Sequence, residues 1–188
     1  MTETPNPHII DADTLTGGMR PIRRVVVALG SNLGDRVANL QGALNALADT
    51  PDVEVVAVSP VYETEAVGAP AGSPDFLNAV VVVDSTLHAR TLLERALAIE
   101  DAFGRVRTEP GAPRTLDVDL LVVGDKVIEE DDFVLPHPRA HERAIVVVPW
   151  AAVDSDGEIP GQGRVDDLAQ VIDSTTITRV DGLELKIE

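Results

Sequence analysis

The sequence predicts an α+β fold in which helices pack on a mainly antiparallel sheet. Residues 25–123 follow the order strand–helix–strand–strand–helix–strand, and both helical segments are long enough to cross between strands. Apolar residues make up 44% of the chain and aromatic residues only 3%, so the core consists mainly of Val, Leu, Ile and Ala. This order is typical of a ferredoxin-like βαββαβ sandwich with a C-terminal extension. One sheet face would carry the helices, and the opposite face would be free for a site.

The first strand and helix are predicted directly after a polar leader. Residues 1–22 have scattered Pro and Gly and no long apolar stretch, which predicts a disordered leader and no signal peptide. Residues 25–29 are a short apolar run typical of a buried strand. Residues 36–48 carry apolar side chains at helical spacing, and Asp35 is a suitable N-cap. The Gly-rich turn at 30–35 lacks both GxGxxG and the Walker lysine, so a structural turn is favoured over a phosphate loop.

Two further strands flank a long loop. Residues 53–58 and 76–83 are the predicted strands, and residues 62–74 between them are rich in Gly and Pro. Loops of this length are often functional. Asn78 shares a strand face with Phe76. A buried Asn usually satisfies backbone groups, but an Asn beside an aromatic ring also suits recognition of a flat heterocycle.

A second helix is predicted at residues 87–103 and the next strand at 115–123. Glu100, near the end of that helix, is interpreted as a solvated or arginine-paired carboxylate, with contact to a nucleotide as the alternative. A hairpin turn and a short return at 126–128 would follow. The four acidic residues 129–132 then predict a solvated loop.

The last third of the chain begins with a segment that concentrates histidine and arginine. Residues 135–143 hold two of the four histidines and predict a short helical turn that presents His137 and Arg143. Zinc binding is disfavoured because Pro138 interrupts the His-x-x-x-His spacing and no third ligand is near in sequence. A strand, a short helix and an edge strand are predicted at residues 145–148, 165–172 and 175–187.

Charge and composition exclude several classes. The net charge of -17 argues against a general binder of nucleic acids or anionic membranes. The absence of Cys excludes disulfides and thiolate chemistry and suits a reducing compartment. No apolar run reaches the ~18 residues of a membrane span. We therefore expect a cytoplasmic monomer with one catalytic domain, residues 23–188.

The stretch from Arg105 to Asp119 carries the chemistry. Arg105, Arg107 and Arg114 precede Asp117 and Asp119, which lie two residues apart in a predicted strand. Both carboxylates therefore leave one face, with Cα atoms roughly 6–7 Å apart. Paired carboxylates suit Mg²⁺, and guanidinium groups suit phosphate oxygens. Together they predict a site for phosphoryl or diphosphoryl transfer.

A less specific interpretation is that both features are ordinary surface charge. A lone Asp-x-Asp is a weak signal, and arginines in loops are usually solvated. However, residues 104–116 carry three arginines and only one acidic residue, Glu109, within a strongly acidic chain. A basic island of this kind favours an anionic ligand.

Six segments together resemble the 6-hydroxymethyl-7,8-dihydropterin pyrophosphokinase family of folate biosynthesis. They occur in the order and spacing of that family, over roughly residues 25–163. The segments are VVVALGSNLGDR at 25–36, SPVYET at 59–64, DFLNAV at 75–80, FGRVR at 103–107, PRTLDVDLL at 113–121 and LPHPRAHER at 135–143.

The resemblance implies transfer of the β,γ-diphosphate of ATP to the pterin hydroxymethyl group, with release of AMP. It implies two Mg²⁺ ions on Asp117 and Asp119, and transferring phosphates lined by Arg105 and Arg114. The implied ATP contacts are Arg107, Leu120 through its backbone, His137, Arg143 and Glu100. The implied pterin contacts are Thr64, Val67 through its backbone, Phe76, Asn78 and Ile145. ATP and the pterin are the expected small-molecule partners.

The sequence departs from the family pattern at three places. Gly111-Ala112-Pro113-Arg114 stands where Trp-Gly-Pro-Arg is usual, and Glu65 replaces a frequent proline. Ile145 stands where an aromatic ring usually covers the pterin, which would forfeit a stacking increment of about 0.5–1.5 kcal/mol. A catalytically weakened pterin- or nucleotide-binding module is therefore an alternative. Another Mg²⁺-dependent nucleotide transferase is a third reading, disfavoured by Asn78 beside Phe76.

Overall fold

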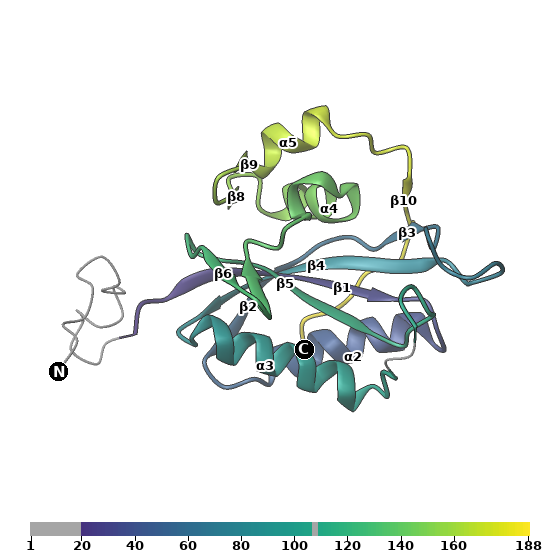
Figure 1. The fold of residues 1–188 in the computed structure, drawn as a ribbon, viewed down its shortest axis with the longest axis horizontal. Coiled ribbons are helices and arrows are strands. Elements are labelled where there is room, and N and C mark those ends of the chain that lie inside the picture. Colours follow the sequence, from purple (N-terminus) through teal and green to yellow (C-terminus); the bar gives the residue numbers. More distant parts are fainter. Residues whose placement is uncertain (1–19, 107–108) are drawn as a thin grey trace.

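A computed structural model describes residues 20–106 and 109–188. Its centre is a six-stranded sheet in which β2 pairs with β4 beside the order β10-β3-β4-β1-β5, and all neighbours are antiparallel (Figure 1). The strands are β1 (Arg23–Ser31), β2 (Val53–Val58), β3 (Tyr62–Thr64), β4 (Phe76–Ser85), β5 (Asp117–Val123) and β10 (Ile177–Arg179). The order β2-β4-β1-β5 is that of a ferredoxin-like sandwich, so the predicted fold class is confirmed.

Helices cover both faces of this sheet (Figure 1). Helices α2 (Arg36–Ala48) and α3 (Ala89–Ala102) lie on one face, and α4 (Ala144–Val153) and α5 (Val165–Val171) lie on the other. The predicted N-cap of α2 is confirmed, because the Asp35 carboxylate accepts a 3.0 Å hydrogen bond from the Ala38 backbone N–H. Among the described residues, no helix has the length and apolar character needed to cross a membrane.

Strand β1 contributes to two separate cores. Val25, Val27 and Leu29 pack with α2 and α3, whereas Val26 packs with α4 and α5. This division follows from the two-residue period of a strand, which sends successive side chains to opposite faces. The near-continuous apolar run of β1 therefore reflects burial on both sides.

The strand predicted at residues 145–148 is wrong, because this segment begins helix α4. The run Ala144–Val153 is apolar almost throughout, and such a run does not distinguish a buried strand from a buried helix. The segment packs against both the sheet and α5, and this packing favours a helix over a strand. The expectation of a sheet face free of helices is therefore also wrong, since α4 covers part of it.

The acidic stretch after β5 is a hairpin of its own. Strand β6 (Ile128–Glu130) pairs with β7 (Phe133–Leu135), so the predicted short return does not pair with β5. Arg90 on α3 binds Glu130 and contacts Asp132 at 2.9 Å. The predicted solvated acidic loop is thus partly strand and partly ion-paired.

The C-terminal segment crosses the edge of the sheet. Only Ile177–Arg179 of the predicted edge strand is β-structure, and it pairs with β3. The chain then passes to the face that carries α2 (Figure 1), where the Gln41 side chain exchanges hydrogen bonds of 2.8 and 2.9 Å with the Lys186 backbone. The remaining elements are the predicted helical turn, η2 (Ala140–Glu142), and the short pair β8 (Glu158–Ile159) and β9 (Gly163–Arg164).

Candidate active site

A cavity of about 1390 Å³ opens on the sheet beside α4 and brings the predicted site residues together. Every one of them except Arg107 lines it, and Arg107 lies outside the described residues. The lining includes Thr64, Val67, Phe76, Asn78, Glu100, Arg105, Arg114, Asp117, Asp119, Leu120, His137, Arg143 and Ile145.

Three neighbouring strands set the centre of this cavity. Gly30 of β1 pairs with Asn78 of β4 on one side and with Asp117 of β5 on the other. Ala28 lies one step further along the same face and pairs with Asp119. Side chains of directly paired residues leave the same face, so both aspartates face the cavity, as the two-residue spacing predicts.

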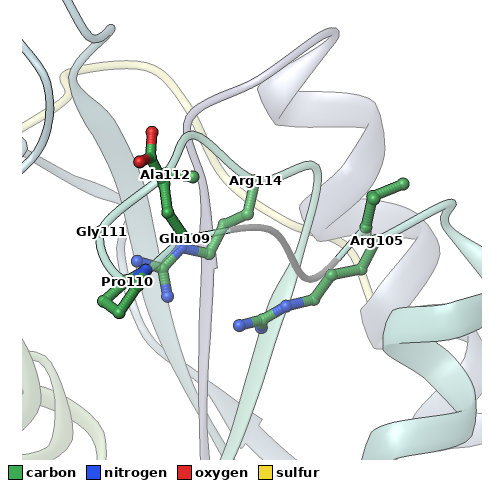
Figure 2. A pocket seen from close by; sticks show the side chains of 7 residues that line it. Arg105, Glu109, Pro110, Gly111, Ala112 and Arg114 are labelled. Atoms are coloured by element: carbon green, nitrogen blue, oxygen red, sulfur yellow. The ribbon is translucent and has the colours of Figure 1, made fainter.

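Two arginines bind Asp117 from the two ends of one loop. The Arg105 Nη1 contacts the Asp117 carboxylate closely, and the Arg114 Nη1 lies 2.9 Å from its other oxygen. Figure 2 shows Arg105 and Arg114 with Pro110 and Gly111 between them in sequence, around a smaller cavity of about 240 Å³. These guanidinium groups already neutralise one carboxylate where phosphate oxygens are expected to bind.

Glu100 is buried behind this pair. It is 3% exposed, accepts a 2.9 Å hydrogen bond from Arg105 and accepts another of 2.9 Å from the Val118 backbone N–H. The arginine-paired interpretation of Glu100 is therefore confirmed, and the carboxylate also fixes the start of β5. The buried carboxylate holds Arg105 at the mouth of the site.

Asn32 is a residue that the sequence reasoning missed. Its Oδ1 accepts a 2.8 Å hydrogen bond from the Arg114 backbone N–H, and its own backbone N–H donates to the Arg114 carbonyl at 3.2 Å. Its Nδ2 donates to the Pro74 carbonyl at 3.1 Å. The only sequence signal was its place in the turn directly after β1. The loop that connects Arg105 to Arg114 is called the arginine loop below. Asn32 thus links this loop to the segment that leads into Phe76.

The Arg114 side chain keeps a spare donor. Its guanidinium carbon lies 5.4 Å from the centre of the Phe76 ring, and its Nε is buried with no hydrogen-bond partner within the described ranges 20–106 and 109–188. A buried donor of this kind is costly unless a ligand satisfies it. An anionic ligand at Arg114 would supply the missing acceptor.

The cavity perturbs two titratable groups. Burial raises the pKa of Asp119, and the neighbouring Asp117 carboxylate raises it further. Burial lowers the pKa of His137, although the nearby Asp119 opposes this shift. Asp119 is therefore a poorly solvated carboxylate whose ionised form a bound cation would stabilise.

The donor set fits Mg²⁺ better than a metal with a complete protein cage. Asp117 and Asp119 supply hard oxygen ligands on one face, and the described part of the chain contains no group of three or more His, Cys, Asp or Glu placed to hold an ion. Mg²⁺ typically takes one or two protein carboxylates and completes its shell with water and substrate phosphates.

Strands β3 and β4 carry the side of the cavity where the pterin contacts are expected. The Asn78 Nδ2 donates to the Thr64 hydroxyl at 3.2 Å and is within 3.4 Å of the Tyr62 carbonyl. Val67 also lines the cavity but is 94% exposed. Ile145 lies in the first turn of α4. Phe76 comes from the sheet and Ile145 from helix α4, and both line the cavity.

The unusual Gly111 lies where two loops meet. It has a φ of +79°, and a Cβ at this position would lie 2.9 Å from the Gly68 carbonyl oxygen. Any side chain here would need the arginine loop and the loop before β4 to move apart. The departure from the family tryptophan thus accompanies a direct backbone contact between the loops.

The fold and the gathered carboxylate and guanidinium groups are those of an enzyme that transfers phosphate groups. The family described as 7,8-dihydro-6-hydroxymethylpterin-pyrophosphokinase (HPPK) matches residues 26–155. The 2-amino-4-hydroxy-6-hydroxymethyldihydropteridine pyrophosphokinase of Synechocystis sp. is 40% identical over 162 residues, 85% of this chain and 82% of its own length. The protein of the same name from Mycobacterium leprae is 43% identical over 173 residues, 86% of this chain and 88% of its own length.

The chain therefore belongs to the HPPK family. It is a pyrophosphokinase of folate biosynthesis that transfers the β,γ-diphosphate of ATP to the hydroxymethyl group of 6-hydroxymethyl-7,8-dihydropterin and releases AMP. A solved structure, Plasmodium falciparum HPPK-DHPS with pterin and p-hydroxybenzoate, superposes with a TM-score of 0.68 at 12% identity. It covers 94% of this chain but this chain spans only 50% of that one, and the likeness concerns the fold alone.

Proposed function

We propose that this pyrophosphokinase depends on Mg²⁺ and that Asp117 and Asp119 hold two ions together with the ATP phosphates. The observation that carries the proposal is the row Asn78–Gly30–Asp117 across three paired strands. In this row a single strand, β1, separates the Asn78 amide, which suits a flat heterocycle, from the Asp117 carboxylate, which suits a metal ion. A hydroxyl on the heterocycle is then directed toward the carboxylates.

The pterin contacts follow from this row. Phe76 stacks on one face of the ring and Ile145 covers the other, while Asn78 and Thr64 hydrogen-bond its edge. The backbone of Val67, rather than its exposed side chain, completes the edge contacts. The aliphatic Ile145 keeps dispersion contact but gives up about 0.5–1.5 kcal/mol of ring stacking.

The phosphate contacts come from the arginine loop and the segment after β7. When ATP binds, Arg105 and Arg114 leave the Asp117 carboxylate and bind phosphate oxygens instead. The buried Nε of Arg114 then gains a hydrogen-bond acceptor. His137 and Arg143 hold the nucleotide phosphates, as does Arg107, and Leu120 meets the adenine through its backbone. Bound Mg²⁺ would neutralise phosphate charge and lower the pKa of the attacking hydroxyl. The protein groups orient that hydroxyl in line with the β-phosphorus.

The direct test is the release of AMP from ATP, with the hydroxymethyl-dihydropterin present or withheld and Mg²⁺ present or chelated. We expect AMP only when both are present. Arg114→Ala should lower kcat by about 10²–10³-fold, the cost of removing one preorganised donor to the developing charge. Arg24→Ala is the matched control, because Arg24 also pairs with a carboxylate, Asp84 at 2.7 Å, but lies at the far end of β1.

Other outcomes of this experiment would contradict the proposal in different ways. Undiminished AMP formation in chelator would exclude the metal dependence. Bound pterin without AMP would favour the weakened binding module, for which the Gly111 contact is the structural argument. A monomeric state and a cytoplasmic location stay predictions, to be checked by light scattering and by cell fractionation.

A further inference from the structure

Side chains on the cavity face of β1 become smaller toward the site. Along this face the residues are Val26, Ala28 and Gly30, whereas the opposite face carries the uniformly large Val25, Val27 and Leu29. The decrease from isopropyl to methyl to hydrogen occurs only on the cavity face. It leaves a trough whose floor is the backbone of β1, and both Ala28 and Gly30 line the cavity.

The surroundings of Gly30 define the space that its missing side chain leaves. A Cβ there would lie 3.3 Å from the Asn78 Oδ1, 3.7 Å from the Phe76 ring and 3.8 Å from the Asp117 Cβ. It would therefore stand between the proposed pterin contacts and the first proposed metal ligand. These distances allow an added methyl group with a shift of a few tenths of an ångström at Asn78, without a clash with backbone.

The backbone gives no reason for glycine at this position. Gly30 is not among the glycines with positive φ, and it pairs on both sides within the sheet. Glycine in the interior of a strand weakens it and often marks a close approach of a ligand. An alanine would suit the strand better, so the empty space itself is the feature that requires an explanation.

We propose that Gly30 is a specificity-determining residue that keeps the floor clear where the pterin hydroxymethyl group crosses from Asn78 to Asp117. This inference rests on the proposed function. The missing side chain sets the depth at which the flat ring lies, and hence whether its hydroxyl reaches the carboxylates. Nucleotide binding, for which we propose His137, Arg143 and the backbone of Leu120, makes no contact with residue 30.

Calorimetric titration of the full chain tests this without turnover. The probes are 6-hydroxymethyl-7,8-dihydropterin, titrated in the presence of Mg²⁺ and α,β-methylene-ATP, and α,β-methylene-ATP alone with Mg²⁺. For Gly30→Ala we expect the pterin Kd to rise about tenfold or more, the scale of one methylene in a fitted pocket. Gly30→Val should raise it further, and both variants should keep the Kd of the ATP analogue.

Val27→Ala is the matched control. Val27 is 3% exposed on the opposite face of β1, so its truncation destabilises the same strand and leaves the trough unchanged. We expect a lower thermal midpoint with an unchanged pterin Kd. In the wild-type protein, pterin binding should shift the amide resonance of Gly30 much more than that of Gly124, which lies beyond the other end of β5. This measurement needs no variant.

Three results would overturn the inference. They are a wild-type pterin Kd in Gly30→Ala, equal weakening of pterin and ATP analogue, and a Gly30 resonance that pterin does not move. If the wild-type chain itself neither binds the pterin nor releases AMP, the proposed function fails instead. The two failures are therefore distinguishable.

Discussion

At the residue scale, Asp119 shows how catalytic chemistry opposes stability. Burial and the neighbouring Asp117 raise its pKa above the ordinary value of 3.8. A carboxyl with a raised folded pKa contributes stability that is fully present below 3.8 and is lost as pH rises through the folded pKa. At pH values above its ordinary pKa, Asp119 therefore lowers the free energy of unfolding of the metal-free enzyme.

Asp119→Asn should remove this loss. We expect the variant to have a higher free energy of unfolding than the wild type at pH 7 without Mg²⁺, and the difference should shrink as pH falls toward 4. Activity should fall by at least about 10²-fold because a proposed metal ligand is gone. Urea unfolding at a series of pH values, in chelator, measures the first effect. Parallel pH profiles for the two proteins would contradict it.

Asn32→Ala should act on catalysis through Arg114. The variant loses two part-buried hydrogen bonds, to the Arg114 N–H and the Pro74 carbonyl, each with a net contribution of about 0.5–1.5 kcal/mol. We expect a lower kcat, and a much smaller further loss when Arg114 is already Ala. A double-mutant cycle on kcat measures this coupling.

Ser85→Ala controls for lost stability alone. Ser85 is 2% exposed at the far end of β4, donates to the Asp52 carbonyl at 2.6 Å and accepts from the Leu87 N–H at 3.1 Å. Its loss should lower the thermal midpoint and leave kcat unchanged. Additive effects of Asn32→Ala and Arg114→Ala would mean that Asn32 only stabilises the fold.

At the element scale, the C-terminal segment supports β3, which carries the proposed pterin contact Thr64. Strand β10 covers the outer edge of β3, and the Val180 N–H donates to the Val61 carbonyl at 2.9 Å. Leu185, 5% exposed, then joins the core beneath the sheet. Because β3 is only Tyr62–Thr64, its position depends on partners on both sides.

A chain that ends after Asp173 should therefore bind the pterin less well. We expect a lower thermal midpoint and a pterin KM raised by up to about 10²-fold, the scale of a ~1 Å misplacement, with a smaller change in the KM for ATP. Steady-state kinetics with each substrate varied in turn gives the KM for the pterin and the KM for ATP separately. Gln41→Ala, which removes both hydrogen bonds to Lys186 and one to Asn45 within α2, should have a weaker effect in the same direction. An unchanged pterin KM in the truncated chain would refute this role of β10.

At the scale of the whole molecule, one sheet joins two cores. Leu40 on α2 is fully buried beneath the sheet, and Trp150 on α4 is 1% exposed above it. Both cores share β1, so loss of packing in one should reach the other through the strands. This arrangement favours the predicted single domain, residues 23–188.

Leu40→Ala tests this cooperativity. The variant should lower the free energy of unfolding by about 2–5 kcal/mol, since it opens a cavity in a packed core. Trp150 is the only tryptophan, so its fluorescence reports the core on the other face. We expect fluorescence and far-ultraviolet circular dichroism to give the same shifted urea midpoint. An unshifted fluorescence transition would indicate two independent units.

Features that depend on local period and capping could be predicted from the sequence alone. The strand near Val25, helix α2 with its Asp35 cap, and the common face of Asp117 and Asp119 all follow from spacing along the chain. The ordered set of family segments also identified the substrates and the residues that now line one cavity.

Features that join distant segments could not be predicted from the sequence and are visible only in the folded chain. The sequence predicts a strand at the start of helix α4 because this segment is almost uniformly apolar. Its packing against the sheet favours the helix. The link from Asn32 to Arg114 spans 82 residues of sequence, and the floor at Gly30 exists only because Asn78 and Asp117 pair beside it. The spacing of apolar residues predicts which side of a helix or strand is buried, but it does not predict which other element packs against that side.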